Sequence, residues 1–307
     1  MRDSPQLPMA LLAGFLFAAL GLVAAPPSQA LTVTDQTGRP ITLPAPPRRI
    51  ISLVPGATEI LFAIGAQDRL VGVTDFCDYP PGARRKPSVG GMLAPSLEAM
   101  VALKPDLVVA TTAGNREETV AQLDRLGIAV YLVNPAGVND VLRMMEGLGE
   151  IAERREAAGQ AVAGLRRRID AVARRVAARP RPRVLYVLWP EPLIVPARGA
   201  FVSELIALAG GASVTAGAGE GYPRYSLEAA VAQAPQVILL ARHGAGTGPV
   251  AQEQWERLSS LPAIKAGRLH AVDGDVFHRY GPRIVDALEA LARLIHPDAF
   301  SRAAPPR

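Results

Sequence analysis

An internal repeat constrains the possible folds of this chain more than any other feature. The segment Ser96–Ala102, followed by Pro105 and an apolar run, recurs as Ser226–Ala232, followed by Pro235 and a second apolar run. Two further pairs occur in the same order, namely Arg49–Ile51 with Arg183–Leu185 and Thr58–Leu61 with Ser203–Ile206. Three ordered matches, with connections of differing length, indicate two lobes built to one plan.

Within the first copy, short apolar runs alternate with amphipathic segments. The predicted strands are 50–54, 70–73, 107–110 and 128–133, and the predicted helices are 58–64, 96–103 and 115–126. Asn115 and Glu118 match an N-terminal capping pair, and Gly127 lies where the chain must leave the helix. Residues 31–47, which precede this pattern, are predicted to form a small β-hairpin. The alternation is typical of βα units on a mainly parallel sheet.

One long helix is predicted between the two copies. Its apolar residues are spaced by fours and threes, which places them on one stripe. They are Ala158, Val162, Leu165, Ile169, Val172 and Val176. An ordinary core helix within one domain is the alternative, against which the repeat argues. The predicted class is α/β, with two Rossmann-like lobes joined by a single long α-helix and a ligand cleft between them. The predicted boundaries are 31–152 for the N-terminal lobe, 153–179 for the linking helix and 180–307 for the C-terminal lobe.

The first thirty residues have the pattern of an export signal. Met9–Ala25 are apolar, and Ser28-Gln29-Ala30 fits the small-x-small rule for cleavage. Residues 1–30 are therefore predicted to be a signal peptide that is cleaved near Ala30, which gives a periplasmic protein. A retained single-pass anchor is the alternative, although the apolar run is short for a bilayer span. No later segment is predicted to cross a membrane.

Cysteine content and charge argue against two other classes. Cys77 is the only cysteine, so an internal disulfide is impossible and stability must come from packing. The net charge of +5 accompanies arginines that are concentrated between Arg154 and Arg179, where they alternate with the apolar stripe. A solvated helix face explains this charge, and no nucleic-acid partner is predicted.

Several motifs together give the chain a specific resemblance. They are Arg49-Ile50-Ile51-Ser52-Leu53-Val54-Pro55, Thr58-Glu59, Gly72-Val73, Asp78-Tyr79-Pro80-Pro81, Leu97-Glu98 and Leu103-Lys104-Pro105-Asp106-Leu107-Val108. As a set they resemble the helical-backbone class of periplasmic binding proteins, and most closely its vitamin B12-binding members. The resemblance covers about residues 48–294. It implies a monomeric carrier that delivers a corrinoid to an ABC permease dimer and its ATPase, with no cofactor apart from the transported ligand.

A cleft between the lobes is also expected from the residues themselves, because ligands bind beyond the carboxyl ends of strands in open α/β sheets. A corrinoid is a large disc with an apolar rim and edge amides, so its binder needs aromatic faces and a few fixed polar groups. The predicted ligand-binding residues are Phe76, Tyr79, Met92, Trp189, Tyr222, Tyr225, Asp275, Val276, Phe277, His278, Arg279 and Tyr280. Core filling is the alternative role for each aromatic residue taken alone.

Departures from the resemblance leave the cargo open. By the resemblance, Phe76 stands where vitamin B12 binders have a pocket tyrosine, and Asp275–Arg279 match a segment of the opposite wall. Met92, Thr111 and Val276 stand where those proteins have tryptophans. A ferric siderophore or a haem is therefore an alternative cargo.

His278 is a candidate axial ligand of a transported metal chelate. A histidine in a pocket loop could coordinate cobalt or haem iron, and Tyr280 could do the same for iron. Hydrogen bonding within the pocket is the alternative role of His278. His243, His270 and His296 lack a ligand-like spacing, so no resident metal site is predicted.

Glu98 and Glu228 occupy matched positions in the repeat and are candidate docking residues. Each lies in the first turn of a predicted helix, where the helix dipole favours negative charge, and this local effect is the alternative explanation. Two carboxylates related by approximate two-fold symmetry also suit a symmetric transporter. The resemblance implies that they pair with arginines of the permease.

The sequence predicts no catalytic machinery. The glycines at 210–211 and 217–221 do not form a dinucleotide fingerprint, and no phosphate-binding loop is present. Ser52 and Ser203 lie in no nucleophile elbow. A chelatase-like or metallocluster enzyme on paired α/β lobes is the alternative from another class. An adhesin or sensor that keeps the two lobes but has lost transport is a third possibility.

Overall fold

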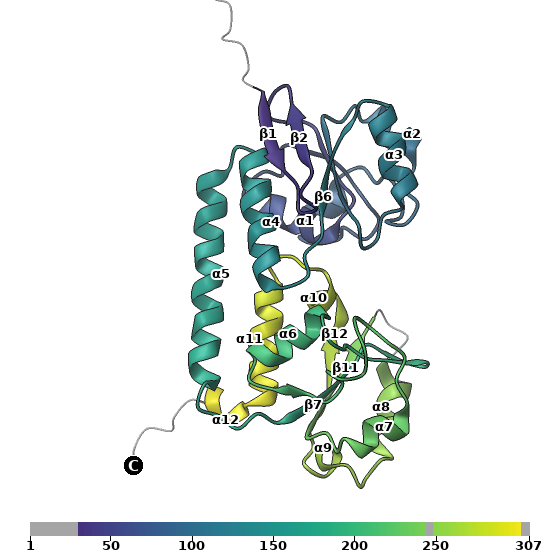
Figure 1. Cartoon of the computed structure of the whole chain (residues 1–307), viewed down its shortest axis with the longest axis vertical. Coiled ribbons are helices and arrows are strands. Elements are labelled where there is room, and N and C mark those ends of the chain that lie inside the picture. Colours follow the sequence, from purple (N-terminus) through teal and green to yellow (C-terminus); the bar gives the residue numbers. More distant parts are fainter. Residues whose placement is uncertain (1–29, 244–247, 302–307) are drawn as a thin grey trace, which may run out of the picture.

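The computed structural model describes residues 30–243 and 248–301, so the predicted signal peptide lies outside the described residues except for Ala30. Two parallel four-stranded sheets form two lobes (Figure 1). The N-terminal order is β4 (Leu70–Val73), β3 (Ile50–Ser52), β5 (Leu107–Thr111), β6 (Ala129–Val133), and the C-terminal order is β10 (Ala212–Ser213), β7 (Arg183–Val187), β11 (Val237–Arg242), β12 (Leu269–Asp273). In both four-stranded sheets, the strand that comes second along the chain lies at an edge. The first, third and fourth strands of that sheet follow it in this order. This shared order confirms the predicted two-lobed α/β class.

Helices form most connections between these strands. In the N-terminal lobe they are α1 (Pro55–Ala63), the 3-10 helix η1 (Ala83–Arg85), α2 (Leu97–Ala102), α3 (Glu117–Arg125) and α4 (Val138–Ile151). In the C-terminal lobe they are α6 (Phe201–Leu208), α7 (Leu227–Ala232), α8 (Gly248–Glu256), α9 (Pro262–Lys265), α10 (Gly274–His278), α11 (Ile284–Ile295) and α12 (Pro297–Phe300). Two antiparallel hairpins complete the chain, β1 (Leu31–Thr34) with β2 (Pro40–Leu43) and β8 (Trp189–Pro190) with β9 (Leu193–Ile194). The first of them is the hairpin expected from the alternating apolar residues.

The two copies agree in local detail. Ser96 and Ser226 cap α2 and α7, and each hydroxyl accepts a hydrogen bond from the backbone N–H three residues later, at 3.1 and 3.0 Å. Arg49 directly precedes β3 and Arg183 begins β7, and their guanidinium groups donate to backbone carbonyls just after those helices. The repeat therefore includes the contacts that fix each helix to its sheet.

The predicted capping pair at the start of α3 is wrong. The helix begins after Arg116, with no side-chain cap. The Asn115 carboxamide instead accepts from the Thr111 N–H at 2.7 Å and donates to the Met92 carbonyl, also at 2.7 Å. Asn115 therefore links two strand-end loops. Gly127 ends the helix as predicted, with φ of +71°.

Helix α5 (Arg155–Val176) runs beside both lobes (Figure 1). Its predicted stripe faces the protein, and five of the six residues are buried. At 1.5 Å per residue its 22 residues span about 33 Å. The helix packs against α4 of the N-terminal lobe and α11 of the C-terminal lobe. The Arg168 guanidinium anchors it to α11 through Glu289 at 2.8 Å and Asp286 at 2.5 Å.

A single apolar core extends through both lobes. It contains one face of each sheet together with α1, α4, α5, α6 and α11. Smaller clusters cover the other faces, against α2 and α3 in one lobe and α7, α8 and α9 in the other. Helix α4 is not predicted from the sequence. Its close packing on α5 requires Gly149, because a Cβ there would lie 2.3 Å from the Ala158 Cβ. The continuous core and the rigid α5 favour small movements of the lobes over wide opening.

Candidate ligand-binding site

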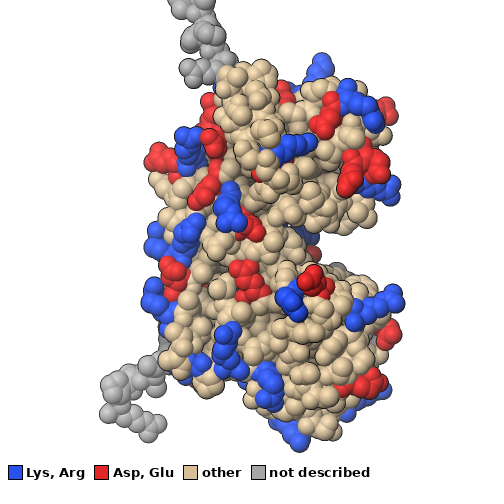
Figure 2. Space-filling view, in the orientation of Figure 1, with Lys and Arg blue, Asp and Glu red and all other residues tan. Residues whose placement is uncertain are grey.

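A cavity of about 840 Å³ lies where the two lobes face each other. Figure 2 shows the molecule deeply indented between its upper and lower halves. The cavity lies beyond the carboxyl ends of the strands, the region where open α/β sheets bind ligands. Its lining residues are Val54, Pro55, Gly56, Phe76, Gly91, Met92, Leu93, Ala94, Thr111, Ala113, Gly114, Pro135, Tyr222, Asp275, His278, Arg279 and Tyr280.

The N-terminal lobe supplies an apolar wall. Of its lining side chains only Thr111 carries a polar group. Phe76, which follows β4, is 56% exposed, so its ring is available for contact with a ligand. Met92 is held by the Asn115 carboxamide described above, and its Sδ and Cε lie next to Gly114. This wall offers van der Waals contact to the face of a flat, apolar ligand.

The C-terminal lobe supplies a polar wall. All five of its lining side chains carry a polar group. The Tyr222 and Tyr280 hydroxyls lie 3.4 Å apart, and the Tyr280 ring stacks on Phe201 with ring centroids 4.4 Å apart. Burial, followed by the neighbouring Tyr280, raises the pKa of Tyr222, so this phenol stays protonated and can donate. The wall suits the hydrogen-bonding edge of a ligand.

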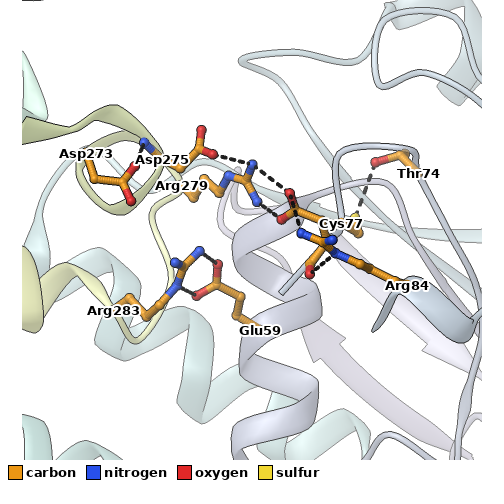
Figure 3. A network of polar contacts seen from close by, with 9 residues as sticks. Glu59, Thr74, Cys77, Arg84, Asp273, Asp275, Arg279 and Arg283 are labelled. Atoms are coloured by element: carbon orange, nitrogen blue, oxygen red, sulfur yellow. Dashed lines mark hydrogen bonds and ion pairs between the residues drawn. The ribbon is translucent and has the colours of Figure 1, made fainter. Parts of the chain in front are cut away.

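Direct contacts tie the lobes together beside the cavity. The Arg283 guanidinium of the C-terminal lobe makes two hydrogen bonds to the Glu59 carboxylate of α1, at 3.0 and 2.6 Å (Figure 3). Burial raises the pKa of Glu59 against the opposing effect of Arg283, whose own pKa is raised by this contact. Gly56 packs directly under the backbone of the other lobe, because a Cβ there would lie 2.4 and 2.5 Å from the Arg279 and Tyr280 carbonyl oxygens.

His278 belongs to a stack of rings behind the polar wall. Its Nε2 lies 3.2 Å from the Tyr186 hydroxyl, and its ring centroid is 5.2 Å from that of His243. Burial and then the neighbouring His243 lower the pKa of His278 to about 4, so the ring is neutral at pH 7. Because Nδ1 is buried and Nε2 faces Tyr186, the geometry favours packing and hydrogen bonding over the axial-ligand role predicted as possible for His278.

Comparison with known proteins agrees with this architecture. The model of the family described as "Periplasmic binding protein" matches residues 50–276. The chain belongs to this family. Family members bind a small-molecule ligand and deliver it to an ABC permease.

Individual relatives of this binding protein cover most of its length. The Vitamin B12-binding protein of Vibrio cholerae is 32% identical over 246 residues, which are 80% of this chain and 88% of that protein. The solved structure of periplasmic vitamin B12 binding protein BtuF of Vibrio cholerae has a TM-score of 0.73 and 31% identity, covering 84% and 99% of the two chains. The periplasmic heme-binding protein RhuT from Roseiflexus sp. RS-1 has a TM-score of 0.74 and 27% identity, covering 82% and 99%.

The structure brings seven of the twelve predicted ligand-binding residues of the binding protein to one cavity. They are Phe76, Met92, Tyr222, Asp275, His278, Arg279 and Tyr280. They come from both lobes and from segments up to about two hundred residues apart in the chain. The shared cleft is therefore where the repeat leads one to expect it.

Five predicted residues lie elsewhere. Phe277 is 3% exposed and packs in the core against Tyr186, so replacing it would disturb folding. Val276 is partly buried against the same core. Trp189 stacks on His243, Tyr79 lies under the Arg283 guanidinium, and Tyr225 lines a separate groove of about 390 Å³. Aromatic character in a loop did not distinguish core, ion-pair and cavity positions.

Small residues were missed as cavity residues. Val54 lies between β3 and α1, Pro55 and Gly56 begin α1, and Pro135 follows β6; all four line the cavity. Their position at or just after the ends of predicted strands is the available signal, because parallel strand ends gather at one edge of a sheet. None of them carries an aromatic ring or an ionisable group, so side-chain chemistry alone does not mark them as cavity residues.

Glu98 and Glu228 are both exposed and lie in the first turns of α2 and α7. Both helices lie on the side of the molecule away from α5 (Figure 1). Within residues 30–243 and 248–301, neither carboxylate forms an ion pair. In the same described part of the chain, no helix is long and apolar enough to cross a membrane.

Proposed function

We propose that this protein binds a corrinoid of the vitamin B12 type between its lobes and delivers it to an ABC permease. The observation that carries this proposal is the pairing of an apolar wall with a polar wall across one cavity. A corrinoid offers the matching surfaces, since its ring faces and rim are apolar and its edge bears amides. The relatives named as vitamin B12-binding proteins support the same cargo.

Binding requires only small movements of the lobes in this proposal. The ring lies against Phe76 and Met92, and edge amides hydrogen-bond to Tyr222 and Tyr280. The rigid α5, the continuous core and the Glu59–Arg283 pair hold the walls near their working separation. A preformed site loses less conformational entropy when the ligand binds.

Docking and processing complete the proposal. Glu98 and Glu228 each pair with an arginine of one permease half, and their exposure and lack of an ion pair in the described residues support this role. Residues 1–30 are removed near Ala30 on export. Residues 31–152 and 180–307 are the lobes, and 153–179 link them. We infer a transport role for the protein and assign it no reaction.

Haem is the second candidate cargo. Structures of heme-binding proteins resemble this chain as closely in fold as the vitamin B12 binder does. The polar wall also presents Arg279 and two tyrosines, which are groups that haem could use. The two candidates differ in charge, because haem carries two propionates where a corrinoid carries amides.

Titration calorimetry with cyanocobalamin, haemin and a ferric hydroxamate tests the proposal. We expect one cyanocobalamin to bind per chain with a dissociation constant below about 1 µM, and the other two to bind at least about tenfold more weakly. Tighter binding of haemin or of the hydroxamate than of cyanocobalamin would contradict the corrinoid assignment. Removal of the signal peptide is checked by N-terminal sequencing of the exported protein, which we expect to begin at Leu31.

A further inference from the structure

Arg279 is the one cationic side chain among those that line the cavity within the described residues. It lies between two carboxylates. One is Asp78 of the N-terminal lobe, which its guanidinium contacts through both Nη atoms, and the other is Asp275, with an Nη2 to Oδ2 distance of 3.0 Å. Figure 3 shows Arg279 with Asp275 on one side and Arg84 on the other.

The network has no net charge. Asp78 also lies 3.7 Å from the Arg84 guanidinium, so two arginines and two aspartates form the group. Partial burial works against ionisation of Asp78, but the hydrogen bond from Arg279 and the charges of Arg279 and Arg84 lower its pKa. Burial likewise opposes the charge of Arg279, and its two aspartate contacts outweigh that effect and raise its pKa. Asp78 and Arg279 therefore remain ionised at neutral pH.

Neutralisation changes what the cavity can accept. A free arginine in a largely apolar pocket would attract a ligand carboxylate through a charge-assisted hydrogen bond. Here an incoming carboxylate would have to displace Asp78 or Asp275, or lie beside both of them, and it would lose its own hydration. A neutral amide avoids both costs, because its NH2 can donate to the aspartates and its oxygen can accept from the arginine.

We propose that Asp78 and Asp275 neutralise Arg279 so that the cavity selects amide-bearing chelates over carboxylate-bearing ones. This inference rests on the proposed function and assigns to Asp78, which does not line the cavity, a role in specificity. Repulsion of the wrong ligand contributes to selectivity as much as attraction of the right one.

The sharpest probe is one ligand with a single amide changed. Mild acid converts side-chain amides of cyanocobalamin to carboxylates, and the separated monocarboxylic acids sample different edges of the ring. We expect at least one acid to bind the wild-type protein about tenfold more weakly than cyanocobalamin. The quantity to compare is the ratio of the dissociation constant of the acid to that of cyanocobalamin. In the Asp78→Asn variant this ratio is expected to fall to about threefold or less, because Arg279 regains net positive charge.

Two further variants separate charge selection from a structural effect. Asp68→Asn removes an equal charge from the N-terminal lobe at the opposite ends of the strands, where Asp68 is exposed and pairs with Arg154, and it should leave the ratio unchanged. Arg279→Gln leaves the two aspartates without their shared cation and should increase the ratio. A variant that merely loosened the contact between the lobes would weaken the binding of cyanocobalamin and of the acid equally. Circular dichroism establishes that each variant is folded.

The outcomes are distinguishable from failure of the proposed function. Suppose that cyanocobalamin binds. The charge-selection proposal would then be overturned if the ratio were equal in the wild-type and Asp78→Asn proteins, or if the wild-type protein bound cyanocobalamin and the acids equally well. If cyanocobalamin does not bind, the corrinoid assignment fails, and haemin against its dimethyl ester then tests the selection. The wild-type protein should prefer the ester, and Asp78→Asn should lose that preference; a preference for haemin in the wild-type protein would overturn it.

Discussion

The two lobes share a strand order and matched helix caps, yet they present opposite surfaces to the cavity they enclose. The N-terminal wall consists mostly of small and apolar groups, with Phe76, Met92 and Leu93 among its larger side chains. The C-terminal wall consists of phenols, an imidazole and an ion pair. The two lobes thus share one scaffold, while their strand-end loops differ in the groups that they present to the cavity. Selection for folding and selection for binding act on different residues in each lobe.

The largest expected effect concerns Glu98 and Glu228, the matched positions at which the two lobes remain equivalent. Reversing the charge at both proposed docking residues, Glu98→Arg with Glu228→Arg, should reduce cargo uptake in cells to background, because each introduced arginine would face an arginine of the permease as a like charge. The dissociation constant for cyanocobalamin should change less than about twofold, since neither residue lines the cavity.

Single reversals sharpen this comparison. Glu98→Arg and Glu228→Arg should impair uptake to similar extents if the lobes dock equivalently on two permease halves. Uptake at the wild-type level in the double variant, with the protein present in the periplasm, would remove both residues from the docking surface.

Gly56 tests the contact between the lobes. Gly56→Ala places a methyl group against the Arg279 and Tyr280 carbonyl oxygens, and we expect a loss of about 2–3 kcal/mol of unfolding free energy. Gly159→Ala on α5 is the matched control, because no described atom other than those of its chain neighbours and the surrounding α5 backbone lies within 4 Å of its added Cβ. The control should be neutral or stabilising by up to about 1 kcal/mol. Urea unfolding measures both, and equal stabilities would show that the lobes do not meet closely at Gly56.

The histidines of the C-terminal lobe should make stability depend on pH between about 6.5 and 4. All four histidines lie in that lobe, and burial, followed by the neighbouring His243, lowers the pKa of His278 from its ordinary value of 6.5 to about 4 in the folded protein. Below pH 6.5 the unfolded chain binds a proton that folded His278 does not, so stability falls as pH decreases through this window. The contribution lost between pH 7 and 5 is on the order of 2 kcal/mol.

A His278→Gln variant isolates this contribution. Its unfolding free energy should fall less steeply than that of the wild-type protein between pH 7 and 5, when both are measured by urea unfolding. Burial also lowers the pKa values of His270 and His296, and these two histidines are present in both proteins. Parallel pH dependences would contradict the burial of a neutral His278 ring.

The smallest effects compare the two walls directly. Phe76→Ala removes an exposed ring and should weaken cyanocobalamin binding about tenfold with less than about 0.5 kcal/mol change in stability. Tyr222→Phe removes only the hydroxyl next to Tyr280 and should weaken binding about two- to fivefold. Calorimetry of each variant tests the division into apolar and polar walls, and no change in either variant would place the ligand elsewhere.

Much of the fold could be predicted from the sequence because its signals are local or repeated. Strand patterns, the α5 stripe and the Ser96 and Ser226 caps each depend on neighbours within a few residues. The α4 helix was missed because it contains Gly147 and Gly149, whose presence reflects close tertiary packing rather than helix propensity. Asn115 was misassigned for a related reason, since its carboxamide serves a distant loop.

The candidate site was harder to predict because it depends on which way each side chain points. Phe277 and His278 are adjacent, yet one fills the core and the other lines the cavity. The short helix α10 turns successive side chains in different directions, and loop composition alone does not reveal this. The Asp78–Arg279 contact joins residues 201 positions apart and follows only from the meeting of the two lobes.

A structure of the protein bound to cyanocobalamin tests most directly whether both lobes form a single ligand site. We predict one corrin ring in the shared cavity, with a face against Phe76 and Met92 and its edge amides within hydrogen-bond distance of Tyr222, Tyr280 or the Arg279 network. A ligand that contacted one lobe only, or that occupied the groove beside Tyr225, would contradict the two-walled site.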